Sequence, residues 1–280
     1  MVTCMIFNVM YYYFLIFAIC IGISLGIVSG YMVTRRWSIL GDIISHAALP
    51  GVAISFLITH SCTLPGLLSG AMVSSFLSIL IGFYIQKRSA LPKDSSFALV
   101  LACFFSLGII VLNIIQKSSI PGQSILNNFI FGNILMLNHH YIWVYVLFAV
   151  LLLFFTILFF KKKEFFAFDK NFSELRFKNI FLFEALFLSM HIITIILGLQ
   201  AIGILLIGGF IIIPGSFARL FCTSFLQLVF LSSIISMVSF VLGIHTSFLY
   251  PWIPTGPLCL LFGSIFFMIG FLVNMMRRKG

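Results

Sequence analysis

The chain has 280 residues, of which 62% are hydrophobic and 8% charged, and its formal net charge is +10. Soluble domains carry about a quarter charged residues, so this composition excludes a water-soluble globule and indicates a membrane protein. The positive charge fits the basic cytoplasmic loops of such a protein, and no nucleic-acid partner is expected. The six cysteines are scattered without a C-x-x-C pair, which argues against both a disulfide framework and a thiolate metal cage.

Apolar runs long enough to cross a bilayer recur along the chain and predict an all-α polytopic membrane protein with about nine transmembrane helices. The expected spans are 9–33, 37–59, 64–86, 96–115, 140–160, 180–199, 201–217, 219–243 and 256–276. With the N-terminus placed outside, fifteen of the sixteen Lys and Arg residues fall on the cytoplasmic side. The positive-inside rule therefore predicts an outside N-terminus and a cytoplasmic C-terminus.

Two apolar stretches fit a regular span poorly. Residues 124–136 are too short to cross, which favours a re-entrant or interfacial segment. The run at 201–217 is interrupted by glycines and a Pro-Gly pair, and such irregular helices occur at membrane depth where protein or a cavity surrounds them. The whole chain, 1–280, is expected to form a single transmembrane domain, with one sizeable cytoplasmic loop at 161–180.

The second apolar run contains an acid and an imidazole, in "SILGDIISHAALPG" at 38–51. A spacing of four places Asp42 and His46 on one helix face, about 9 Å and about 15 Å into the bilayer when counted from Arg36. An acidic side chain at such depth costs about 2.5–3.5 kcal/mol, whereas an interhelical hydrogen bond contributes about 0.6 kcal/mol. A functional role is therefore favoured over an Asp–His hydrogen bond that fastens the helix.

This donor set also limits the kind of site. A carboxylate and an imidazole suit Mn, Fe or Zn dications, and a site with only two ligands suits passage of an ion better than storage. No permanently bound cofactor is expected, only a transported ion. The Leu-Pro-Gly that follows at 49–51 is expected to kink the helix and free carbonyl groups beside the pair.

The other titratable residues carry weaker indications. Four histidines fall at expected outer loops and are candidates for a vestibule that collects metal, although solvated loop histidines are the favoured interpretation: His60, His139, His140 and His245. His191 is interpreted as a hydrogen-bonded interior residue. Glu184 lies near the expected start of its helix, where the helix dipole favours its charge.

The stretch "GDIISHAALPGVAISFL" resembles the signature of the integral-membrane permeases of ABC-type manganese, zinc and iron uptake systems. Three further stretches resemble segments of the same family in the expected order: "NNFIFGNIL" at 127–135, "LQAIGILLIGGFIIIPGSFARLF" at 199–221 and "PTGPLCLLFG" at 254–263. The matches span most of the chain, and the first is highly specific. The resemblance implies a type II ABC importer-like permease, located in the bacterial cytoplasmic (inner) membrane.

The resemblance also implies partners and a cargo. It implies a homodimer or a pair of homologous permeases in membrane lipid, with a metal-binding protein outside and an ABC ATPase inside. The Asp and His of the signature carry over onto Asp42 and His46, which are expected to meet the transported Mn, Zn or Fe ion. The chain has no G-x-x-x-x-G-K-[ST] phosphate loop, so it is expected to be no enzyme, with ATP hydrolysis in the separate ATPase chain.

The segment 214–221 is implied to be the cytoplasmic surface that couples to the ATPase, through Pro214, Ala218 and Arg219. Arg219 also falls inside by the charge count, which agrees with that role. Phe217 departs from the run of small residues that the family has there. Its bulk implies either a changed ATPase interface or no effect.

Three alternative functions stay open at the level of the sequence. A permease for metal chelates, siderophores or cobalamin would give no reason for the Asp–His pair. A membrane-embedded metal-dependent enzyme would need several converging acids or histidines, whereas the chain has six acids and no H-E-x-x-H motif. A carrier driven by an ion gradient would not depend on ATP. The side-chain types do not separate Mn from Zn or Fe.

Overall fold

The computed structural model describes residues 2–59, 63–118, 130, 132, 142–161, 164, 180–250 and 252–279. Most of the predicted re-entrant segment 124–136 and of the predicted loop 161–180 lies outside the described residues. The same holds for three of the vestibule candidates, His60, His139 and His140. These interpretations therefore stay predictions.

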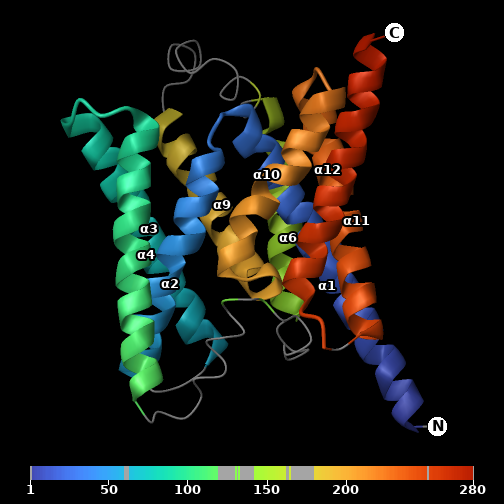
Figure 1. Cartoon of the computed structure of the whole chain (residues 1–280), viewed down its shortest axis with the longest axis horizontal. Helices are drawn as coiled ribbons and strands as arrows, with labels where there is room; N and C mark the ends of the chain where they lie inside the picture. The colour runs from blue at the N-terminus through green and yellow to red at the C-terminus, as the bar shows by residue number, and fades with distance from the viewer. Residues whose placement is uncertain are drawn as a thin grey trace.

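Within the described residues the regular structure is entirely α-helical. The helices are α1 (Val2–Thr34), α2 (Ser38–Thr59), α3 (Leu64–Arg88), α4 (Lys93–Lys117), α6 (Ile142–Leu158), α9 (Ile180–Ile202), α10 (Ile204–Phe221), α11 (Phe225–Leu249) and α12 (Thr255–Lys279). Eight are long and apolar enough to cross a membrane, and α6 is a shorter apolar helix. The two termini lie at opposite ends of the bundle (Figure 1), as an odd number of crossings requires. The predicted all-α polytopic membrane protein is confirmed.

Residues at the helix ends help to explain where these helices begin and stop. α3 has Pro65 in its first turn, where the fixed φ of proline suits a helix start. It ends with Lys87 and Arg88, whose charges interact favourably with the C-terminal end of the helix dipole. Ser224 caps α11, because its hydroxyl oxygen accepts a hydrogen bond of 3.4 Å from the Gln227 N–H.

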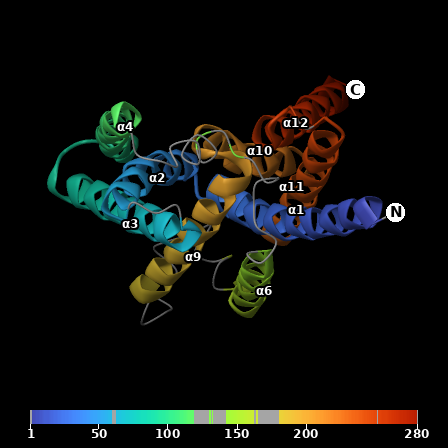
Figure 2. The same cartoon turned by 90° about the horizontal axis from the view of Figure 1, so that it is seen from below.

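The helices form two groups with α9 and α10 between them (Figure 2). In one group, α2, α3 and α4 pack against one another. In the other, α1 packs against α11, and α11 against α12. Because α10 contacts α1, α2, α11 and α12, it is a principal link between the groups.

α1 and α11 approach closely because small residues face each other. Gly22, Gly26 and Gly30 are spaced by four and lie on one face of α1. A methyl group at Gly26 would lie only 2.7 Å from the Ser232 carbonyl oxygen. The Ser232 hydroxyl donates a hydrogen bond of 2.8 Å to the Gly26 carbonyl. Close backbone contact of this kind stabilises helix pairs in lipid, where no hydrophobic driving force acts between helices.

A single residue, Gly203, separates α9 from α10. Its φ of 91° lies in the left-handed region, which glycine adopts without steric cost. The interruptions expected in the run 201–217 therefore reduce to this one break, since α10 continues through Pro214. Gly132, with φ of 72°, lies against the backbone of Ile202 at the same turn. One residue of the predicted re-entrant segment thus contacts the α9–α10 turn.

Candidate functional site

Asp42 lies where α2 packs against α10. Its side chain is half-buried. A methyl group added at Gly208 of α10 would overlap the Asp42 Oδ1 atom and lie 3.0 Å from its Cγ. One residue earlier, a methyl group at Gly41 would lie 3.2 Å from the Ile211 side chain. The carboxylate therefore lies directly on the backbone of α10, in a space that only glycine leaves open.

His46 lies one turn further along α2, beside α4. Its ring is half-buried, and its centroid is 5.0 Å from that of Phe105 on α4, with an interplanar angle of 76°. Its Nδ1 atom is buried and has no hydrogen-bond partner. A buried polar atom without a partner costs free energy, and a neutral imidazole nitrogen is a common metal ligand.

Asp42 and His46 share a face of α2, as their spacing predicts, but no hydrogen bond or ion pair joins them in the described structure. Two serine hydroxyls bond the backbone of this part of α2 instead, one from within α2 and one from α3. Ser45 donates to the Asp42 backbone carbonyl at 2.8 Å, and Ser75 of α3 donates to the Ile44 carbonyl at 2.8 Å. An Asp–His hydrogen bond is therefore not what fastens this helix. No third His, Cys, Asp or Glu completes a metal-binding group within the described ranges.

The three predicted coupling residues have different environments on α10. Pro214 and Ala218 are buried, whereas Arg219 is exposed. The backbone after Pro214 is fixed to α1, because the Gly215 N–H donates a hydrogen bond of 2.8 Å to the Ser29 hydroxyl. Arg219 also contacts α1, because its Nη1 atom donates a hydrogen bond of 3.5 Å to the Val33 carbonyl. Of the three residues, Arg219 alone has an exposed side chain that a partner could contact directly.

The bulk of Phe217 is accommodated inside the chain. A methyl group at Gly270 of α12 would lie 2.8 Å from the Phe217 Cδ2 atom. Phe217 also packs on Phe221, with ring centroids 5.2 Å apart. The departure from small residues at this position therefore coincides with a glycine on the facing helix that makes room for the ring.

The remaining described histidines are engaged elsewhere. His245 is exposed on α11, and its Nδ1 atom lies 2.9 Å from the Tyr11 hydroxyl. The structure does not group it with Asp42 and His46. His191 is buried, and its Nδ1 atom bonds the Phe187 carbonyl, which confirms the predicted interior role.

A charged cluster at the turn between α1 and α2 was not predicted from the sequence. Arg35 pairs with Glu184 of α9, with 3.4 Å between Nη2 and Oε1. The Arg35 guanidinium carbon and the Lys93 ammonium lie 4.7 Å and 4.5 Å from the centroid of Trp37. Glu184 lies beyond the first turn of α9, where the helix-dipole effect has fallen off, so the predicted role of the helix start is wrong and Arg35 is the group that stabilises its charge. These residues come from distant parts of the sequence, so no local sequence pattern predicts that they are in contact.

A helical bundle of membrane-spanning helices with a polar pair inside it defines a polytopic membrane protein. The model of the ABC 3 transport family matches residues 7–274, and the chain belongs to this family. It is 30% identical over 260 residues to the manganese transport system membrane protein MntC of Listeria innocua, a match that covers 92% of this chain and 88% of that relative.

Two further comparisons agree. The chain is 28% identical over 241 residues to the zinc transport system membrane protein TroC of Treponema pallidum, covering 86% of this chain and 81% of the relative. It superposes on the structure of PsaBC from Streptococcus pneumoniae in complex with Fab with a TM-score of 0.79 and 29% identity, covering 92% of this chain and 89% of that one. The chain is therefore a multi-pass permease subunit of an ABC metal transporter, located in the bacterial inner membrane.

Proposed function

We propose that this chain moves a divalent transition metal ion, Mn, Zn or Fe, across the membrane, and that Asp42 and His46 meet the ion. The observation that carries the proposal is the position of the Asp42 and His46 side chains together with the missing hydrogen-bond partner of His46. Both side chains share one face of α2 inside the bundle, and the buried His46 Nδ1 atom has no partner. A passing cation would supply an electrostatic partner to both groups.

A second permease half completes the site in this proposal. One chain offers two side-chain ligands among its described residues, whereas Zn in protein sites takes four ligands and Mn more. A homodimer, or a pair with a homologous permease, would bring a second Asp–His pair to the ion. Pro50 has no N–H to bond the carbonyl of His46 four residues earlier, so this oxygen is a further candidate ligand.

Energy enters through a separate ABC ATPase on the cytoplasmic side, and the ion arrives from a metal-binding protein outside. α10 is suited to connect the ATPase with the site. Its Gly208 lies on the Asp42 carboxylate, and its exposed Arg219 is about 16 Å further along the helix. Movement of α10 against α2, driven by the ATPase, would expose the pair alternately to the two sides of the membrane.

The test is uptake of Mn, Zn and Fe isotopes by vesicles that contain the permease, its ATPase and its binding protein. The variants Asp42→Asn and His46→Ala are expected to abolish ATP-dependent uptake while the complex stays assembled. Ser45→Ala is the matched control, because this hydroxyl lies between the two residues but bonds only the backbone. Normal uptake in both variants would show that the pair is structural. Absence of metal uptake by an assembled wild-type complex would favour an organic-chelate permease.

A further inference from the structure

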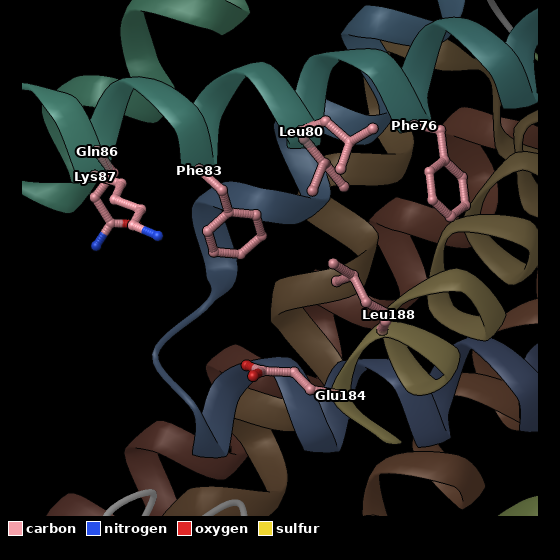
Figure 3. Close-up of a pocket in the computed structure, with 9 residues that line it drawn as sticks. Phe76, Leu80, Phe83, Gln86, Lys87, Glu184 and Leu188 are labelled. Atoms are coloured by element: carbon pink, nitrogen blue, oxygen red, sulfur yellow. The ribbon is translucent and has the colours of Figure 1, made fainter. Parts of the chain in front are cut away.

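A groove with a volume of about 560 Å³ lies between α3 and α9, away from the Asp42–His46 pair. Figure 3 shows that side chains of both helices point into it. Its walls are apolar over most of their length, formed by Phe76, Ile79, Leu80 and Phe83 of α3 with Ala185 and Leu188 of α9. Polar side chains lie at one end, where Gln86, Lys87 and Glu184 line the groove.

The groove has the length of one bilayer leaflet. α3 rises about 16 Å from Phe76 to Lys87, and the hydrocarbon core of a bilayer is about 30 Å thick. The apolar walls therefore extend from the polar end to about the midplane. An acyl chain of a phospholipid covers the same depth, with its headgroup level with the last turn of α3.

The polar end of the groove is electropositive. Glu184 is the one acid among the described lining residues, and its pairing with Arg35 at 3.4 Å compensates its charge. Lys87 lines the groove and is exposed, whereas the next residue, Arg88, is exposed but is not part of the lining. Basic pockets between membrane helices on the cytoplasmic side suit anionic lipid headgroups, and the positive-inside rule places this end there.

We propose that the groove binds one anionic phospholipid, with an acyl chain between α3 and α9 and its phosphate against Lys87. The lipid would fill the groove between α3, of the α2–α3–α4 group, and α9. This proposal is independent of metal transport, because no group of the Asp42–His46 site lines the groove.

The experiment measures lipid retained by the purified full chain in native mass spectrometry, after incubation with phosphatidylglycerol or phosphatidylcholine of the same acyl chains. Wild type is expected to retain one phosphatidylglycerol and little phosphatidylcholine. Lys87→Gln removes the phosphate contact, and retention should fall about five-fold. Arg88→Gln is the matched control, because it removes the same charge one residue away from the lining. Ala185→Trp fills the groove and should abolish retention, whereas Ala98→Trp, at an exposed alanine of α4, should not.

Three results would overturn the proposal. Equal retention of phosphatidylcholine and phosphatidylglycerol would show that the groove does not discriminate between the two headgroups. An equal loss in Lys87→Gln and Arg88→Gln would show general attraction to a basic surface and no groove. Loss of a dimer in Ala185→Trp, with lipid retention unchanged, would show that a second copy of the chain covers this face.

Discussion

The Asp42 carboxylate packs directly against the backbone of α10 at Gly208, where no side chain intervenes. The neighbouring glycine, Gly209, serves as a natural comparison, since a methyl group there would meet only Leu260 at 3.5 Å. The two glycines are adjacent in sequence but differ in what they allow. Gly208 sets the position of the Asp42 carboxylate, and Gly209 does not.

Gly208→Ala is therefore expected to lower metal uptake about 10- to 100-fold, as loss of an orienting neighbour does at metal sites. The methyl group displaces the Asp42 carboxylate from α10. Gly209→Ala should leave uptake unchanged, and both variants should assemble to the same extent. Isotope uptake in reconstituted vesicles measures the difference. Equal uptake in the two variants would contradict a positioning role for Gly208.

The sequence predicts the Asp42–His46 pair because both residues lie on one helix, where a spacing of four has a single geometric meaning. It does not predict Gly208, because that residue comes from a helix that packs against Asp42 only in the folded chain. The same holds for Phe105 beside His46. The sequence around a glycine in an apolar run does not show which side chain will pack against that glycine.

Among the helices, α1 and α11 show how small residues decide a contact. Gly26 faces the backbone of Ser232 and Ser233, which cannot move aside without shifting a helix. Gly263 of α12, in contrast, has Ile213 at 3.5 Å, an ordinary contact distance. A methyl group has space at Gly263 and none at Gly26.

We expect Gly26→Ala to destabilise the protein by about 1–3 kcal/mol, the usual cost of overpacking. Gly263→Ala should be neutral or slightly stabilising, because alanine favours a helix more than glycine does. The midpoint of thermal unfolding in detergent measures both, with expression matched. An unchanged midpoint for Gly26→Ala would mean that α1 and α11 are not held by close backbone contact.

The number and order of the helices follow from hydrophobic run lengths, which a sequence shows directly. The ends of α10, in contrast, do not follow from the lengths of the hydrophobic runs. Glycines and a proline in the run 201–217 predict several irregularities, yet only Gly203 adopts a conformation that breaks the helix. The others are absorbed by packing: Gly208 meets Asp42, and the Gly215 N–H finds the Ser29 hydroxyl. Such partners lie outside any local window of sequence.

At the scale of the whole molecule, the charge distribution predicts which end of the bundle faces the cytoplasm. Thr63 follows α2 at one end, and Ala90 joins α3 to α4 at the other. Both residues are exposed. The basic residues Lys87, Arg88 and Lys93 flank Ala90, so that end is expected inside.

A cysteine at each position tests this orientation in a chain whose six native cysteines are replaced. In intact cells, a membrane-impermeant maleimide is expected to label Thr63→Cys. It should label Ala90→Cys only after the cells are permeabilised. The reverse pattern would place the N-terminus in the cytoplasm and would also place the proposed lipid in the opposite leaflet.

The Asp42–Gly208 contact has a consequence for the energetics of the transport cycle. In the proposed mechanism, the cargo and α10 both contact the Asp42 carboxylate, so cargo binding and movement of α10 would be thermodynamically linked. If movement of α10 changes the affinity of the site for its ion, the ion changes the free energy of that movement by the same amount. The ATPase would then move α10 more easily, or less easily, in a permease with a bound ion than in an empty one. Through the contact at Gly208, binding of the ion would thereby change how easily α10 moves.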